Sequence, residues 1–337
     1  PVFRLPRDII DKEISQVLEQ NIKIYYNKDI KTYKEVEKLA AKYDAVLLAL
    51  GTLKPNEINN EFSKSYNVED GLDFLLRVNE YKSKYIGKNV VVIGGGYTSM
   101  DCARTALRLG AKTVRTFYRR TTNDLIILPG ELEELINEHG KMIFNAQPIK
   151  LIEKNNRLTA LELIKTKLVK KKGAYHLEDI KGSSFKINTD HVILAIGQQQ
   201  HLSLGKNKRN NIFSVGDFAT GATTLINAIA HAKDVVKRVD KFLMKRDLFK
   251  SDLKVTDIKT TGRRLDLNYI PIQEMPTINL NQRTFGREVE KGYKKNSAQK
   301  EASRCYLCHY KFEINNNLCV LCDECLLAKP IEDCIVE

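Results

Sequence analysis

The sequence predicts an α/β fold in which parallel strands alternate with helices, followed by a small cysteine-rich segment. Apolar runs of strand length at 45–50, 89–93 and 190–196 each lead into a glycine. Continuous apolar runs of this length are typical of parallel strands buried on both faces. Six of the seven cysteines stand in the last part of the chain, between 305 and 334.

Length and composition favour a globular protein of more than one domain. The 337 residues leave room for two or three domains, and 42% hydrophobic with 29% charged residues is ordinary for such proteins. No apolar run approaches the roughly 18 residues of a membrane span. The first residues, PVFRLPRDII, lack a signal-peptide pattern, and clustered thiols without one predict a reducing, cytoplasmic location.

The net charge of +13 has two interpretations. A polyanionic partner is one, and lysines spread over solvated faces are the other. No basic run is interleaved with aromatic residues that could stack on bases. We therefore favour the dispersed charge and expect no nucleic-acid partner.

The first 80 residues predict an amphipathic helix and two strands. Apolar spacing indicates the helix over 8–19. A strand with its turn is expected at 21–26, and another in YDAVLLALGTLKP at 43–55.

A strand–loop–helix–strand pattern follows at 89–120. A buried strand at 90–93 leads into a glycine loop, a helix at 101–109 ends near Gly110, and a second strand covers 113–118. The loop fits the G-x-G-x-x-[small] pattern of dinucleotide-binding units. Its residues are Gly94, Gly95, Gly96, Tyr97, Thr98 and Ser99.

The loop pattern has a chemical reason. Gly94 makes a tight turn, Gly96 lets the backbone approach a pyrophosphate, and Ser99 permits close packing of helix on strand. The helix N-terminus then offers free N–H groups and its positive end to the phosphates.

The end of the second strand predicts the nicotinamide cofactor. An acidic residue there would bind the ribose 2′-OH of NAD, whereas arginine accommodates the 2′-phosphate of NADP. Arg119 and Arg120 occupy this position. We interpret them as a 2′-phosphate site and predict NADPH; the alternative is a pair of solvated arginines at a strand end.

The next segments complete this unit. The acidic stretch at 131–139 predicts a helix with a solvated face, and the alternation at 151–187 predicts a β-meander with a hairpin turn at 170–173. Cys102, inside the helix after the glycine loop, is expected to be a buried core thiol.

The sequence predicts a second cofactor-binding region further along the chain. The strand at 190–196 ends at Gly197, and a short strand at 212–215 leads into Gly216-Asp217 and a helix from Thr223 or Thr224 to Leu243. Asp217 could accept a hydrogen bond from a flavin ribityl hydroxyl, and the helix N-terminus could face the flavin C2 carbonyl. By itself such a turn is a weak signal.

The cysteine segment predicts a metal site. The run C-x-x-C-x-x-C at 319–325, followed by Lys329-Pro330, matches the [4Fe–4S] pattern of bacterial ferredoxins except that lysine replaces the fourth cysteine. Cys334 is the nearest fourth ligand, and Cys305 or Cys308 the next. A zinc ribbon and idle thiols or disulfides remain alternatives. His309, beside Cys308, could be a further ligand, although we favour a bystander. The predicted ligands are Cys305, Cys308, Cys319, Cys322, Cys325 and Cys334.

The chain resembles the small (beta) subunit of bacterial glutamate synthase and the matching part of dihydropyrimidine dehydrogenase. The resemblance covers residues 1–245 well and 268–310 more loosely. It implies a flavoprotein with two dinucleotide-binding domains, Rossmann-like and similar to glutathione reductase. The segments that carry it are FRLPRDII, GGGYTSMDCARTALRLGA, FYRR, SVGDFATGATTLINAIA and EASRCYLC.

The resemblance implies electron flow from NADPH to FAD and then to iron–sulfur clusters, with a redox partner subunit or ferredoxin-like acceptor. Two departures matter: the chain carries one dinucleotide fingerprint where the family has two, so the FAD domain is expected to be incomplete, and its cysteine segment is C-terminal. The segment 71–79 resembles the family helix that leads into the NADPH domain, and 283–293, within a tether, resembles a short family helix. The expected divisions are 1–80 and 189–245 (FAD domain), 81–188 (NADPH domain), 246–296 (tether) and 297–337 (iron–sulfur segment).

Three hypotheses follow. The first is an NADPH-dependent flavin and iron–sulfur oxidoreductase. The second is a truncated module that binds nucleotide and a cluster without turnover, and the third is a zinc-stabilised interaction protein. No side chain needs to act as an acid or base in hydride transfer to a flavin, so no catalytic residue is predicted.

Overall fold

The computed structural model describes residues 1–58, 62, 65–80, 84–171, 174–202, 209–246 and 270–304. The chain divides into two compact units. The first contains Pro1–Val255 and Thr277–Lys291, and the second contains Thr256–Pro276 and Gly292–Glu337.

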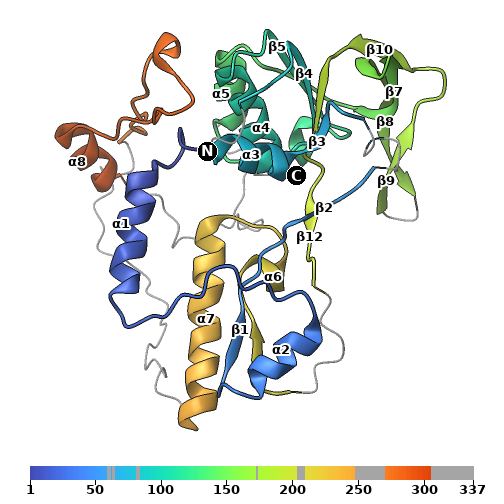
Figure 1. Cartoon of the computed structure of the whole chain (residues 1–337). Coiled ribbons are helices and arrows are strands. Elements are labelled where there is room, and N and C mark those ends of the chain that lie inside the picture. Colours follow the sequence, from blue (N-terminus) through green and yellow to red (C-terminus); the bar gives the residue numbers. More distant parts are fainter. Residues whose placement is uncertain are drawn as a thin grey trace, which may run out of the picture. The chain divides into compact units, whose positions relative to one another are not determined.

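The first unit is built on a five-stranded parallel sheet in the order β3-β11-β4-β5-β6 (Figure 1). Three helices connect its strands, so that the predicted alternation of strands and helices is confirmed. The strands are β3 (Val68–Asp70), β4 (Asn89–Ile93), β5 (Thr113–Phe117), β6 (Lys141–Ile143) and β11 (His191–Leu194), and the helices are α3 (Gly71–Asn79), α4 (Tyr97–Arg108) and α5 (Glu131–Asn137).

Both faces of this sheet are buried, which explains the continuous apolar run in β4. Val90 and Val92 pack with Phe74 of α3 and Met100 of α4 in one core. Their neighbours Val91 and Ile93 belong to a second core on the other face of the sheet. Each fully buried side chain of this kind contributes roughly 1.5–3 kcal/mol of transfer free energy.

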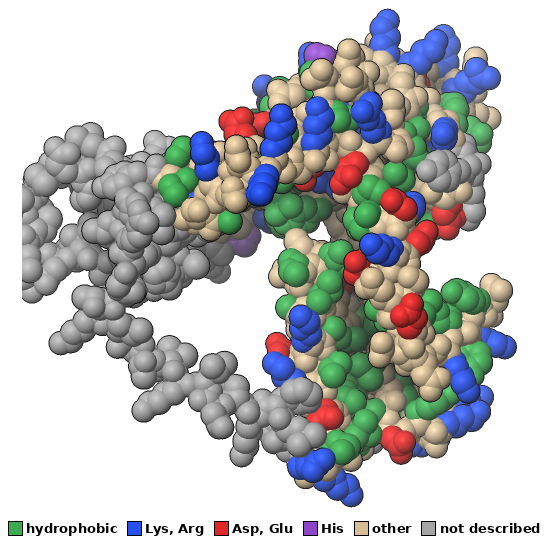
Figure 2. Space-filling model, turned by 90° about the vertical axis from the view of Figure 1, so that its left-hand side faces the viewer, with side chains coloured by type: hydrophobic (Ala, Val, Ile, Leu, Met, Phe, Trp, Pro, Cys, Tyr) green, Lys and Arg blue, Asp and Glu red, His purple; other side chains and the backbone are tan. Residues whose placement is uncertain are grey.

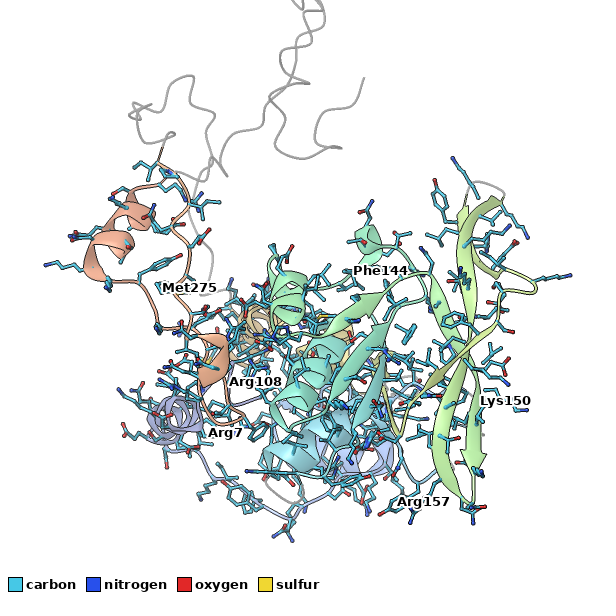
Figure 3. All side chains as sticks on the ribbon, turned by 90° about the horizontal axis from the view of Figure 1, so that it is seen from above. Arg7, Arg108, Phe144, Lys150, Arg157 and Met275 are labelled. Atoms are coloured by element: carbon cyan, nitrogen blue, oxygen red, sulfur yellow. The ribbon has the colours of Figure 1, made fainter. Side chains whose placement is uncertain are left out.

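The second core lies against an antiparallel sheet in the order β10-β8-β7, with β9 also paired to β8. Its strands are β7 (Ala146–Lys154), β8 (Arg157–Lys171), β9 (Ala174–Asp179) and β10 (Phe185–Asn188). A two-residue turn of Asn155 and Asn156, both with positive φ, joins β7 to β8 as in a type I′ hairpin. Figure 3 labels Lys150 and Arg157 on this sheet. The predicted meander is confirmed and begins at Ala146.

A smaller sheet of two parallel strands, β1 (Val46–Leu48) and β13 (Ile212–Ser214), completes the first unit. Helix α2 (Tyr33–Ala40) packs on one face. Helix α7 (Leu225–Met244) packs on the other. The antiparallel strands β2 (Lys54–Pro55) and β12 (Gln198–Gln199) run alongside each other where the chain passes to and from the larger sheet (Figure 1).

Two sequence predictions for this unit are wrong. No strand forms at 21–26, because Asn21 and Asn27 adopt positive φ and interrupt an extended chain. No helix forms at 283–293, because the backbone N–H of Val289 bonds the carbonyl of Phe3 at 3.2 Å and Thr277 bridges Glu290. This part of the expected tether is therefore packed into the first unit. The helix predicted at 8–19 is confirmed as α1 (Arg7–Leu18).

The described part of the second unit comprises residues 270–276 and 292–304. Helix α8 (Lys295–Ser303) is its main element. The Glu301 carboxylate accepts a hydrogen bond from the backbone N–H of Gln273 at 3.0 Å, and the Tyr293 hydroxyl donates to the Gln273 carbonyl at 2.6 Å.

The surface agrees with a dispersed charge. On the face in Figure 2, Lys and Arg side chains are spread among acidic and hydrophobic ones. Among the described residues, no helix is both long and apolar enough to cross a membrane.

Candidate functional site

The glycine loop lies at the carboxyl end of β4, where it turns directly into α4. The Gly94 N–H donates to the Phe117 carbonyl of β5 at 2.9 Å, and the Ser99 N–H donates to the Gly96 carbonyl at 3.0 Å. Helix α4 therefore starts at Tyr97, four residues before the predicted start. This is the strand–loop–helix arrangement that a dinucleotide fingerprint requires.

The three glycines are needed for three different reasons. Gly94 has φ +150°, and an added Cβ would lie 2.2 Å from the Ala195 carbonyl oxygen. A Cβ on Gly95 would lie 2.4 Å from the Tyr118 ring. At Gly96 the nearest atom would be 3.9 Å away, so only this glycine borders open space. That space fits the expected close approach of a pyrophosphate to Gly96.

The N-terminus of α4 presents free donors to the same space. No described group accepts a hydrogen bond from the N–H of Tyr97 or Thr98, which are the first two helical residues. Ser99 is fully buried, and its hydroxyl donates to the Gly96 carbonyl at 2.6 Å. Free N–H groups at a helix N-terminus are suited to bind an anion.

Arg119 and Arg120 follow β5 and are both exposed. Their backbone is held firmly: the Thr166 hydroxyl donates to the Arg119 carbonyl at 2.7 Å, and the Asn145 N–H donates to the Arg120 carbonyl at 3.1 Å. Tyr118 packs over the loop at Gly95 and donates its hydroxyl to the Asp124 carbonyl at 2.8 Å. Burial raises the pKa of Tyr118, which keeps this donor protonated.

The crossing strands β2 and β12 bring Gly197 and Gln198 to the loop. The Asn56 N–H donates to the Gly197 carbonyl at 3.1 Å. The Gln198 amide lies between Thr52 and Thr98, at 3.5 and 3.4 Å from their hydroxyl oxygens. Gln198 thus connects the glycine-loop helix to the crossing strands.

The predicted Gly216-Asp217 turn opens a short helix, α6 (Asp217–Thr220). The Asp217 carboxylate accepts a hydrogen bond from the Thr223 hydroxyl at 2.7 Å. Thr224 caps α7, with its hydroxyl oxygen accepting the Asn227 N–H at 3.4 Å. The predicted start of this helix is confirmed, and its end lies at Met244.

One cavity of about 810 Å³ joins these parts of the first unit. Most of the predicted cofactor residues line it, together with residues that the sequence patterns did not single out, such as Asn56, Tyr118 and Gln198. Gly216, Thr224 and the buried Ser99 do not line it. The predicted residues that line it are Gly94, Gly95, Gly96, Tyr97, Thr98, Arg119, Arg120, Gly197 and Asp217.

The acidic helix α5 is not the solvated face that the sequence predicted. Glu131, Glu134 and Glu138 turn toward arginines from three other segments. The partners are distant in sequence, which is why the local pattern did not reveal them. They are Arg4, Arg104, Arg108 and Arg283; Arg4 also contacts Asp101 in the second turn of α4.

The predicted metal ligands Cys305, Cys308, Cys319, Cys322, Cys325 and Cys334 lie outside the described residues, as does His309. Among the residues that are described, no group of His, Cys, Asp and Glu is arranged to hold a metal ion. Cys102 is buried, as predicted, and burial raises the pKa of its thiol.

Comparison with known proteins supports the same fold. Residues 7–141 match the family described as pyridine nucleotide-disulphide oxidoreductase. FprA of Mycobacterium tuberculosis in complex with NADPH is similar in structure, with a TM-score of 0.58 and 17% identity, over 70% of this chain and 72% of that one. The predicted Rossmann-like α/β fold is confirmed.

Two curated relatives are similar in sequence. The NADPH-Fe(3+) oxidoreductase subunit beta of Geobacter sulfurreducens is 26% identical over 372 residues, covering 92% of this chain and 55% of the relative. The glutamate synthase [NADPH] small chain of Halomonas elongata is 31% identical over 214 residues, covering 59% of this chain and 44% of the relative. The chain therefore spans about half the length of these relatives.

Proposed function

We propose that this chain is the NADPH-binding part, and part of the flavin-binding domain, of an NADPH-dependent flavin and iron–sulfur oxidoreductase. The observation that carries the proposal is the single cavity lined by the glycine loop, by Arg119 and Arg120, and by Asp217 with Thr223. A nicotinamide dinucleotide and a flavin react only when their rings meet, so their sites must share one space.

NADPH would lie along the loop from Gly94 to Ser99. The free N–H groups of Tyr97 and Thr98 would bind the pyrophosphate, and the open side of Gly96 would let it approach. Arg119 and Arg120 would pair with the 2′-phosphate, because guanidinium groups bind phosphate oxygens through two parallel hydrogen bonds.

FAD would be held by Asp217 through the ribityl chain, beside Gly197, Gly216 and the N-terminus of α7 at Thr224. The flavin, when bound, accepts a hydride at N5 and releases electrons singly. The protein's part is to hold both rings in contact, to exclude water and to keep a positive helix end near the flavin.

We propose that the flavin domain is incomplete in this chain. Its sheet has two parallel strands among the described residues, fewer than such sheets need to be stable alone. The hydrophobic residues Leu225, Ile226 and Val236 of α7 are exposed. Both facts support the packing of further strands and apolar side chains against this small sheet and α7. The proposed divisions are 1–80 and 189–245 for the FAD domain, 81–188 for the NADPH domain, 246–296 for the tether and 297–337 for the cluster segment.

A [4Fe–4S] cluster on the C-terminal cysteines remains a proposal based on their spacing. Its ligands would come from Cys305, Cys308, Cys319, Cys322, Cys325 and Cys334. A redox partner subunit or ferredoxin-like acceptor would receive the electrons; the names "subunit beta" and "small chain" of the relatives support a multi-subunit setting. Reduced thiols of this kind favour the cytoplasm.

Visible absorption of the anaerobically purified protein, with FAD added, tests the proposal. We expect the flavin bands to shift as the added FAD binds, beside a broad brown shoulder, and we expect NADPH to bleach both. A shoulder with flavin bands that stay at the position of free FAD would instead favour the second candidate, a module that binds nucleotide and cluster without turnover. Zinc found by metal analysis, with neither bound flavin nor the brown shoulder, would favour a zinc-stabilised interaction protein.

A further inference from the structure

His231 of α7 makes a hydrogen bond whose direction is fixed by chemistry. Its Nδ1 lies 3.0 Å from the backbone nitrogen of Gly216. A backbone N–H only donates, so Nδ1 must accept, and the imidazole must be neutral with its proton on Nε2. The sequence patterns did not single out this residue.

The bond holds a backbone that needs support. Gly216 has φ 62° and ψ −149°, a conformation available essentially to glycine alone. Its carbonyl accepts the N–H groups of Ala219 and Thr220 at 2.9 and 3.1 Å and so begins α6. Its own N–H has no place in that helix, because the first donors of a helix lack an internal partner. His231 satisfies it from α7.

The next residue is Asp217, which lines the cavity and accepts the Thr223 hydroxyl at 2.7 Å. Thr223 directly precedes the N-cap of α7, the helix that carries His231. The turn is thus held at two points: the Gly216 N–H bonds His231 within α7, and the Asp217 carboxylate itself bonds Thr223 just before that helix. We propose that His231 is a positioning residue: through Gly216 it fixes Asp217 for the ribityl hydroxyls of a flavin. This inference rests on the proposed flavin site.

Three variants of the full chain test it. His231→Leu removes the acceptor. His231→Asn restores one, because asparagine Oδ1 is as many bonds from Cβ as histidine Nδ1. His176→Leu makes the same change at an exposed histidine on β9. Three ligands are titrated into wild type and each variant, and binding is followed by fluorescence. The ligands are riboflavin, lumiflavin (which lacks the ribityl chain) and NADPH.

We expect riboflavin affinity to fall about tenfold in His231→Leu, the effect of one unsatisfied donor. Riboflavin affinity should recover in His231→Asn and should equal that of wild type in His176→Leu. The affinities for lumiflavin and NADPH should be the same in wild type and all three variants. Equal riboflavin affinity in wild type and His231→Leu would overturn this inference but not the proposed function. A loss of riboflavin affinity that His231→Asn does not restore would do the same. No flavin binding by wild type would overturn the proposed function as well.

A second measurement is independent of flavin. In ¹⁵N NMR spectra of the protein without ligand, His231 should show an unprotonated Nδ1 and a protonated Nε2 at neutral pH. A protonated Nδ1 would contradict the inference directly, since that nitrogen could not accept the Gly216 N–H.

Discussion

Arg108 of α4 and Glu138, just after α5, form a bidentate salt bridge. Nη1 of Arg108 lies 2.6 Å from Oε2 of Glu138, and Nη2 lies 2.8 Å from Oε1. Their side chains are only 3% and 6% exposed. Arg104 and Arg283 bond the same carboxylate at 2.8 and 2.7 Å. Glu138 therefore connects the glycine-loop helix to the segment 277–291, and Figure 3 shows Arg108 beside that segment.

This cluster predicts a specific loss of stability in acid. Burial alone would raise the pKa of Glu138, but hydrogen bonds from Arg108 and Arg104 outweigh it and lower the pKa from 4.5 to about 2. A carboxylate with a lowered folded-state pKa stabilises the fold fully above its unfolded pKa, and this stability is lost as pH falls from 4.5 toward 2. The loss is on the order of 3 kcal/mol.

Urea unfolding at pH 7 and pH 3 measures about 2 kcal/mol of this loss, because the remainder falls below pH 3. Glu138→Gln should be destabilised at pH 7 and should lose less stability between the two pH values than wild type. Glu133→Gln, at an exposed position of the same helix, is the control and should behave as wild type. If both variants keep the wild-type dependence on pH, Glu138 does not carry this effect.

The cofactor preference is predicted to be NADPH over NADH. Each charge-assisted contact of Arg119 or Arg120 with the 2′-phosphate should contribute roughly 1.5–3 kcal/mol. Calorimetric titration of both nucleotides should show a strong loss of NADPH affinity in Arg119→Ala/Arg120→Ala and little change for NADH. Arg157→Ala, in the antiparallel sheet, serves as the control. Equal affinity of wild type for the two nucleotides would rule out the assignment.

The glycine loop predicts opposite outcomes for two neighbouring substitutions. Gly96→Ala should preserve thermal stability, because its methyl group would meet nothing closer than 3.9 Å, yet it should weaken NADPH binding by occupying the space of the pyrophosphate. Gly94→Ala should lower the melting temperature, since its Cβ would lie 2.2 Å from the Ala195 carbonyl oxygen. Unchanged NADPH affinity in Gly96→Ala would count against the proposed pose.

Local patterns predicted most of the elements that place the site, and long-range contacts account for what they missed. Helix α7 was predicted to within one or two residues at each end, because its apolar spacing is a local signal. The partners of α5 were not predicted: Arg283 and Glu138 are 145 residues apart, and nothing near either residue encodes the pairing. His231 was missed for the same reason, since its bond to Gly216 depends on how α7 packs.

We predict that this chain retains FAD poorly when expressed as given. Asp217 and the N-terminus of α7 would contact only the ribityl chain and the isoalloxazine ring of FAD. A second glycine loop that would hold the FAD pyrophosphate is not found in the sequence. Gel filtration after FAD addition, with absorbance at 450 nm as a flavin wavelength, should show substoichiometric flavin. One FAD per chain after that step would contradict the prediction.

The cysteine segment is predicted to bind one [4Fe–4S] cluster through Cys319, Cys322 and Cys325. Cys334 is the expected fourth ligand, because the ammonium group of Lys329 has no lone pair to offer iron. Iron and acid-labile sulfide should each be near four per chain, following the ligand pattern.

Three serine variants locate the ligands of that cluster. Cys322→Ser should abolish the brown shoulder, because it removes a thiolate from the middle of the C-x-x-C-x-x-C run. Cys334→Ser should weaken the shoulder more than Cys305→Ser does, because Cys334 lies closer along the chain to the other three ligands. Zinc without labile sulfide would exclude the cluster. Full loss of colour in Cys305→Ser, with Cys334→Ser unaffected, would instead move the fourth ligand upstream.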